Sequence, residues 1–220
     1  MPLLGNLSRK NFFQVQFGGI KPGLRTYMAS RGVDSTFIDS DFGLMCYSAE
    51  LPGASLATFE SSNYYGVSEK FAHRRLYDTL SLSFYCDDEY KGLKFLEHWM
   101  EYSISGNTQS ISQYNQKNYT VRMRYPDDPA TGYKSEATRI YKFERNVDRF
   151  MEYSFIGLFP SALSASKVQY ESQGELLDIN CTFTYDRHIA GSMTSIDSIA
   201  GRGNNLISNL VNSGLSLLNL

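Results

Sequence analysis

The chain has 220 residues with 21 Lys and Arg against 23 Asp and Glu, so its formal net charge is -2. This balance argues against a chain built mainly to grip nucleic acid, which carries a basic excess. Hydrophobic residues make up 42% and charged residues 20%, which is typical of a globular protein and excludes a disordered one. No apolar run approaches the roughly 20 residues of a membrane span, and the first residues lack a signal-peptide pattern. We therefore predict a soluble protein, made and kept in the cytoplasm, without a membrane partner.

Six segments alternate apolar and polar side chains with a period of two residues, which predicts strands with one buried and one polar face. Antiparallel sheets with one solvent-exposed face have this pattern, whereas parallel sheets are buried on both faces. The fold class is therefore predicted as mainly β, an antiparallel β-barrel or sandwich. The segments are, in chain order, residues 13–17, 80–86, 119–125, 141–144, 151–155 and 179–185.

One long helix is predicted over residues 90–104, where apolar side chains recur every three to four residues beside Trp99. The acidic residues 87–89 precede it and complement the positive end of a helix dipole, while Gly106 can end it. We expect this one flanking α-helix to cover part of the apolar face of the barrel or sandwich.

Loops separate these elements. Residues 107–118 are rich in Asn, Gln and Ser, and residues 126–132 hold both Pro and Gly. Residues 52–75 are expected to form a longer loop, and a long excursion between strands is often functional. Its conspicuous members are Pro52, Tyr64, Tyr65 and a basic cluster that ends in Arg74 and Arg75.

The last part of the chain differs from the rest in composition. Residues 1–190 are predicted to be one β domain, and residues 191–220 a separate extension rich in Ser, Asn and Leu. An amphipathic helix is predicted there, and its stripe must be buried somewhere. Three alternatives are open for this extension: it packs on its own domain, it contacts a neighbouring subunit or another partner, or it is disordered. The contact residues are Leu206, Leu210, Val211 and Leu217.

No group of residues in the sequence suggests catalysis. The three His residues, His73, His98 and His188, make no metal-ligand spacing, and His188 is expected to be exposed. Nucleophile-elbow, P-loop and dinucleotide-binding motifs are absent. The three cysteines form no CxxC pair and no disulfide framework is predicted. Arginine pairs such as Arg122 and Arg124 are interpreted as solvated or intersubunit groups, with phosphate contact as the alternative. We predict a non-enzymatic assembly protein without metal or cofactor.

Five segments, taken in order, resemble the tail-tube proteins of T-even-like contractile-tailed bacteriophages. No one motif is diagnostic, and the specificity lies in five matches in the right order over about residues 8–187. The segments are Asn11-Phe12-Phe13-Gln14-Val15, residues 44–53 with Cys46 and Leu51-Pro52, residues 78–89 with the helix that follows, Ile156-Gly157-Leu158-Phe159-Pro160, and residues 178–185.

This resemblance implies a tail-tube β-barrel whose subunits form hexameric rings that stack into the inner tube of a contractile tail. The implied partners are the tail sheath protein, baseplate and tube-initiator or terminator proteins, and genomic DNA and a tape measure protein held in the lumen without sequence-specific binding. The implied location is the virion, after assembly in the host cytoplasm. The loop 52–75 would contact the adjacent ring, with Tyr64 and Tyr65 as anchors.

Residues 191–220 extend past the last strand of the family's shorter members, which leaves the position in the tail open. The alternative within the class is a tube initiator ring at the baseplate. More distant alternatives are a tube protein of a type VI secretion-like system and a monomeric β-barrel binding module for glycan or peptide.

Overall fold

The computed structural model describes residue 8 and residues 10–62, 66–106, 121–144, 150–166, 168–170 and 174–191. The helical segments are α1 (Pro22–Ala29), the π-helical turn η2 (Phe37–Asp41), α2 (Phe42–Leu44) and α3 (Lys91–Ser103). The strands are β1 (Phe13–Gln16), β2 (Cys46–Ala49), β3 (Ala54–Ser62), β4 (Ser68–Tyr77), β5 (Leu80–Tyr85), β6 (Ile104–Gly106), β7 (Val121–Met123), β8 (Thr138–Phe143), β9 (Phe150–Ile156), β10 (Phe159–Leu163), β11 (Asp178–Thr184) and β12 (Arg187–Ala190).

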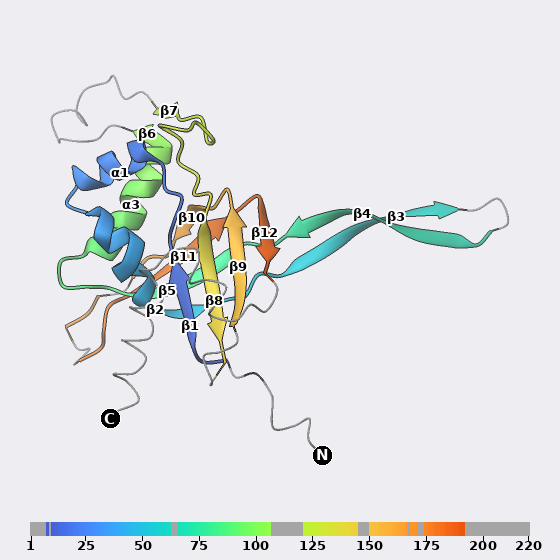
Figure 1. The fold of residues 1–220 in the computed structure, drawn as a ribbon, viewed down its shortest axis with the longest axis horizontal. Helices are drawn as coiled ribbons and strands as arrows, with labels where there is room; N and C mark the ends of the chain where they lie inside the picture. The colour runs from blue at the N-terminus through green and yellow to red at the C-terminus, as the bar shows by residue number, and fades with distance from the viewer. Residues whose placement is uncertain are drawn as a thin grey trace, which may run out of the picture.

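Two four-stranded antiparallel sheets form the body of the molecule (Figure 1). The first sheet has the order β1-β8-β9-β12 and the second the order β10-β11-β5-β2. In the second sheet Ile179 lies opposite Phe84, and Cys181 lies opposite Leu82, so apolar side chains of adjacent strands share the inner face. The prediction of a mainly β, antiparallel fold is therefore confirmed.

Aromatic rings fill the space between the two sheets, and Phe17 lies at their centre. Its ring centroid is 5.3 Å from that of Phe42 on α2 and 5.9 Å from that of Phe183 on β11. The same ring lies 5.8 Å from Phe95 and 6.4 Å from Trp99, both on α3. One side chain thus joins the end of the first sheet, the second sheet and two helices, and each ring pair adds to the area burial.

The helix predicted over residues 90–104 is α3, and its apolar stripe packs into this core. The Trp99 indole N–H donates to the carbonyl oxygen of Tyr133 at 2.7 Å, which satisfies its polar atom inside the core. Asp87 contributes at the helix start because its carboxylate accepts the Gly92 N–H at 3.1 Å. The helix ends at Ser103, where the chain continues into β6, and not at Gly106.

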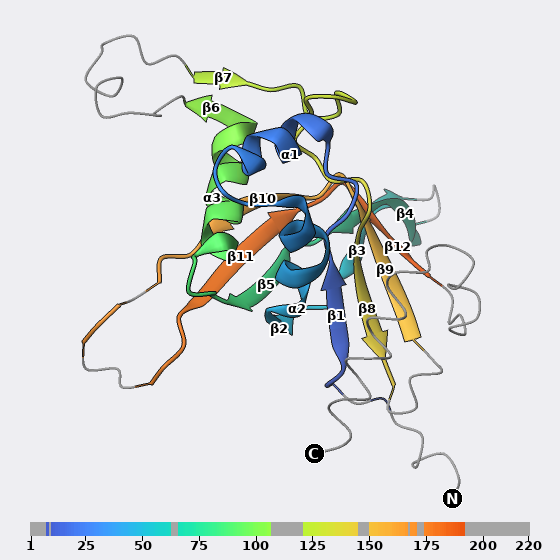
Figure 2. The ribbon, with the colours of Figure 1, turned by 60° about the vertical axis from the view of Figure 1, so that its left-hand side comes forward.

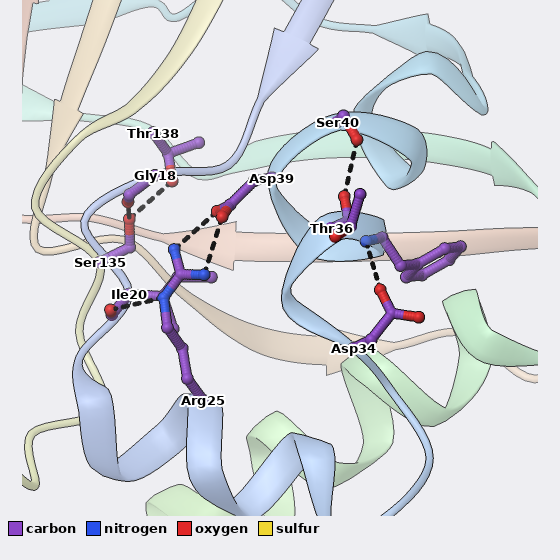
Figure 3. A network of polar contacts seen from close by, with 10 residues as sticks. Gly18, Ile20, Arg25, Asp34, Thr36, Asp39, Ser40, Ser135 and Thr138 are labelled. Atoms are coloured by element: carbon purple, nitrogen blue, oxygen red, sulfur yellow. Dashed lines mark hydrogen bonds and ion pairs between the residues drawn. The ribbon is translucent and has the colours of Figure 1, made fainter.

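The expectation of a single flanking helix is wrong, because α1, η2 and α2 form between β1 and β2. Pro22 occupies the first turn of α1, where its missing N–H costs nothing. The Asp34 carboxylate accepts the Phe37 N–H at 2.7 Å and begins the second helical stretch. Figure 3 shows how Arg25 of α1 donates two hydrogen bonds to the Asp39 carboxylate, at 2.8 and 2.6 Å, and joins the two stretches.

The connection from β1 to α1 is fixed by the strand that lies beside it. Ser135 donates a hydrogen bond to the carbonyl oxygen of Gly18 at 2.5 Å and lies 2.7 Å from the Thr138 hydroxyl (Figure 3). Gly19 has a φ of 66°, and a side chain there would meet the Ala137 backbone nitrogen at 2.7 Å. The connection therefore requires glycine at position 19 for both conformation and space.

Residues 52–75 do not form a loop. β3 and β4 pair over their whole length as an antiparallel hairpin, with a β-bulge between Ala57 and Thr58. The hairpin projects well beyond the two sheets (Figure 1). The turn predicted over residues 126–132 is present, and the Asp128 carboxylate accepts the N–H groups of Ala130 and Thr131 within it. Residues 107–120 and 192–220, which include the predicted C-terminal helix, lie outside the described residues.

Replacement of Phe17 by Ala should lower the free energy of unfolding by about 3–5 kcal/mol, because the cavity removes ring contacts to both sheets and α3. Urea denaturation of the purified subunit measures this loss. The control Tyr125→Ala, at a side chain that is 74% exposed, should change stability by about 0.5 kcal/mol or less. Equal losses in the two variants would contradict the central role of Phe17.

Candidate assembly surfaces

The β3–β4 hairpin is exposed along almost its whole length. Its strands have nine and ten residues, and nearly all of their side chains are exposed on both faces. At roughly 3.3 Å per residue, such strands extend about 30 Å. A two-stranded hairpin is at best marginally stable in water. We therefore expect packing against another surface to stabilise this element.

A pair of stacked phenylalanines marks one face of the hairpin. Phe59 and Phe71 lie opposite each other, with ring centroids 5.4 Å apart and planes inclined by 22°. Their exposed fractions are 53% and 44%, and the His73 ring meets Phe59 edge-on at 6.4 Å. Exposed stacked aromatics are a strong candidate for an interface anchor.

Sequence reasoning did not identify this pair. The predicted anchors Tyr64 and Tyr65 lie outside the described residues. The signal that could have identified Phe59 and Phe71 is their position at matched distances on either side of a turn that contains Gly66. Pro52 is half-buried just before β3, and a side chain at the following Gly53 would meet the Asp78 carboxylate at 2.8 Å, so the two ends of the hairpin lie close together.

The two predicted arginines of this region have different positions. Arg74 pairs with Ala57 and Arg75 with Leu56, and adjacent strand residues face opposite sides of a hairpin. The Arg75 guanidinium lies 5.3 Å from the centre of the Tyr77 ring and donates toward His188 Nε2 at 3.4 Å. Both arginines are exposed, and Arg75 in addition contacts β12 at the base of the hairpin.

His188 is buried, which corrects the expectation that it is exposed. Its side chain is 6% exposed, and its ring lies 5.1 Å from the Tyr77 ring and 6.1 Å from the Tyr153 ring. Nδ1 lies 3.5 Å from the Tyr185 hydroxyl. Burial and, secondarily, the positive charge of Arg75 lower the pKa of His188 below its ordinary value. The neutral imidazole thus belongs to the packing that holds the hairpin base against both sheets.

The two sheets end in four edge strands: β1 and β12 in one, β10 and β2 in the other. An edge strand presents unpaired backbone N–H and C=O groups, which favour pairing with another chain. On β12, Ile189 is 53% exposed and Arg187 is exposed beside it. The edges are therefore candidate contacts between neighbouring subunits.

The outer faces of the two sheets differ in charge. On the first sheet, polar side chains link β1, β8 and β9: Tyr141 donates to Gln16 at 3.4 Å, and Arg139 Nε lies 3.2 Å from a Glu152 oxygen. On the second sheet the strands carry no Lys or Arg, and Asp178 is their only charged residue. Its outer face bears Ser81, Ser83, Asn180, Thr182 and Thr184, which share register positions.

Among the described residues, no cluster of three or more His, Cys, Asp or Glu could hold a metal ion. Within that same part of the chain, no helix is long and apolar enough to cross a membrane. The predicted contact residues Leu206, Leu210, Val211 and Leu217 lie outside the described residues.

Comparison of the sequence with known protein families identifies the family of this chain. The profile of the phage tail tube protein family matches residues 8–191. The chain belongs to this family. The tail tube protein is thus a structural, non-enzymatic component of a phage tail, as the resemblance of the five segments implied. No curated protein matches its sequence.

Solved structures contain chains that are similar to this tail tube protein. The sheath–tube complex of an extracellular contractile injection system, PVC, in the extended state contains a chain with a TM-score of 0.50 and 13% identity; the match covers 85% of this chain and 93% of that one. The PVC sheath/tube terminator has a TM-score of 0.47, 13% identity and coverage of 84% and 97%. The cap of the anti-feeding prophage has a TM-score of 0.48, 13% identity and coverage of 87% and 99%.

The buried His188 should make the stability of the tail tube protein sensitive to mild acid. Because its folded pKa is lowered, the unfolded chain binds the proton more readily, and stability falls as the pH drops through about 6.5. His188→Gln should flatten the fall in melting temperature between about pH 8 and about pH 5.

The control for this experiment is His73→Gln, which removes an exposed imidazole on the hairpin and should leave the pH dependence as in the unmodified chain. Melting followed by circular dichroism at each pH gives both slopes. Identical slopes for His188→Gln and the unmodified chain would show that His188 does not cause the pH dependence.

Proposed function

We propose that this tail tube protein forms hexameric rings that stack into the inner tube of a contractile phage tail and give the genome its path out of the virion. The observation that carries the proposal is the β3–β4 hairpin, a long, almost fully exposed element with a stacked pair of phenylalanines on one face. An isolated subunit gains little from such an element, whereas a stacked assembly covers it.

Ring closure follows from the edge strands. A contact between the edge of one subunit and a different edge of the next is heterologous, and repeating it closes a ring or grows a filament. In a ring closed through β1 and β12 neither of these two edges stays unpaired, which removes their aggregation hazard. Six copies are the number that the tail-tube resemblance implies.

Stacking of the rings is assigned to the hairpin. Phe59 and Phe71 would enter an apolar contact on a subunit of the adjacent ring, and Arg74 would lie at its rim. Tyr64 and Tyr65, which follow β3 in the sequence, stay candidates for the same contact. The packing of His188 and Arg75 at the hairpin base fixes the direction in which the hairpin leaves the body.

The channel for DNA is assigned to the outer face of β10-β11-β5-β2. Its strands offer hydroxyl and amide groups without a single cation, so phosphates find no charged partner there. The other sheet carries Arg139 and the exposed Arg187. DNA and a tape measure protein could therefore move past this cation-free face without sequence-specific binding.

Outside the tube, the proposed partners are the sheath and the baseplate. The PVC chain that shares the fold is found in a sheath–tube complex, and an equivalent sheath around this tube is part of the proposal. Because the helices α1 and α3 lie together on one side of the body, they are the proposed face toward the sheath (Figure 2).

Phe71→Glu should stop tube growth while rings still form, because a carboxylate buried in the contact between rings has no partner. Negative-stain electron microscopy of the purified protein at rising concentration measures tube length. The matched control is Thr58→Glu on the opposite face of the hairpin, where Thr58 is exposed and paired with Ala72. Tubes of normal length with Phe71→Glu would contradict the assignment.

The same images of the unmodified protein test the whole proposal. Long tubes or stacks of six-fold rings support a tube subunit. Single hexameric rings that never grow would favour an initiator at the baseplate. A monomer that does not polymerise even when a baseplate is added would overturn the tube and favour a β-barrel binding module.

The channel assignment has its own test. Asn180→Lys places a cation on the cation-free face and should slow DNA release from phage particles, followed with a DNA-binding dye, without preventing tail assembly. Ser154→Lys adds the same charge to the outer face of the other sheet and should leave release unchanged. The opposite pattern would assign the channel to β1-β8-β9-β12.

A further inference from the structure

An apolar groove opens at one end of the first sheet, where β1 starts and β8 ends. Its volume is about 620 Å³, within the range of roughly 300–1,000 Å³ that is common for ligand pockets. The walls come from both sheets and are mostly apolar. They include Phe13, Ala49, Leu51, Ile140, Phe150 and Met151. A groove of this size can take several apolar side chains.

Three polar side chains at the rim of the groove, Ser8, Lys142 and Glu144, have partners within the chain. Lys142 donates to the carbonyl oxygen of Phe143 at 2.6 Å and lies 3.8 Å from a Glu144 carboxylate oxygen. Ser8 also donates to the Glu144 carboxylate. These side chains therefore need no charged ligand as a partner. The apolar walls of the groove favour an apolar occupant.

The chain leaves the described structure beside this groove. β12 ends with Ala190 opposite Tyr153, and the Gly191 N–H donates to the carbonyl oxygen of Glu152 at 2.6 Å. Glu152 is the neighbour of Met151, whose side chain lines the groove and is 39% exposed. The extension that starts after Gly191 thus begins one residue along β9 from the groove wall.

We propose that residues 206–217 of this extension dock into the groove of their own subunit and close the open end of the sheet. The stripe of Leu206, Leu210 and Val211 supplies apolar side chains, and residues 203–220 contain no charged residue. The 14 residues 192–205 can span at most roughly 45–50 Å, ample for a groove at the exit point. A tethered segment also has an effective concentration of order millimolar, which favours its own subunit.

The proposal makes residues 191–220 part of the subunit rather than a contact to sheath or adjacent ring, and it does not depend on the stacking mode. The other terminus is the main competitor, because Ser8 and Lys10 line the groove and Leu3 and Leu4 precede them. Residues 1–7 contain four large apolar side chains, Met1, Leu3, Leu4 and Leu7, whereas residues 206–217 contain six, which is why the C-terminal segment is assigned.

Disulfide trapping tests the docking in the full chain. Met151→Cys combined with Leu210→Cys should form an intramolecular disulfide under mild oxidation, seen as a monomer band of shifted mobility without reductant. The matched control combines Leu210→Cys with Met123→Cys; Met123 is 85% exposed on β7, at the opposite end of the body (Figures 1 and 2). The yield with Met151→Cys should exceed this control several-fold.

Native thiols interfere little with the experiment. Burial raises the pKa of Cys46 and of Cys181 to about 12, so both stay protonated and slow to exchange. Leu210→Cys alone measures any pairing with these cysteines or with Cys86.

Each other result overturns the proposal in a distinct way. A disulfide-linked dimer in place of the monomer band would mean that the extension enters the groove of a neighbouring subunit. Equal yields with Met151→Cys and Met123→Cys would mean that it does not dock. Efficient disulfide formation between Leu4→Cys and Met151→Cys, with none between Leu210→Cys and Met151→Cys, would mean that the N-terminal segment occupies the groove.

Discussion

The aromatic packing around Phe17 is the interaction on which the rest of this structure depends. Phe17 follows β1, yet its ring contacts α2, α3 and the second sheet. Two twisted four-stranded sheets cover each other incompletely, and α3 fills the remaining side with Phe95 and Trp99. Because protein interiors are close-packed, this cluster fixes the relative position of the sheets. The four sheet edges, which are candidate contacts between subunits, are placed by that position.

The hairpin shows how a rigid body can present a structure that is unstable alone. β3 and β4 have little buried surface of their own, but their base is packed on the body through Tyr77, Arg75 and His188. The hairpin thus leaves the body in a fixed direction and carries the stacked Phe59 and Phe71 outward. A neutral, buried histidine at this base couples the anchorage to pH, since protonation would place a second positive charge beside Arg75.

The surfaces of the molecule differ in chemistry in a way that fits a tube. The hairpin offers apolar anchors, the edges offer backbone hydrogen bonds, and one sheet face offers hydroxyl and amide side chains without a lysine or arginine. The groove beside Met151 adds a fourth surface, which the extension after Gly191 would occupy within the subunit. Assembly contacts and self-contacts would then use different parts of one chain.

The alternating strands and the α3 helix could be predicted from the sequence, because the periods of 2 and 3.6 residues are local properties. The lack of a known catalytic motif could also be read from the sequence. The sequence also identified the family, through ordered segments that the profile match over residues 8–191 confirmed. Local patterns could not show that residues 54–77 pair as a hairpin, since both of its faces are exposed and no buried face marks it. Nor could they place His188, whose burial comes from Tyr77 and Tyr153 on other strands. Such features arise from contacts between distant segments, and only the tertiary structure decides them.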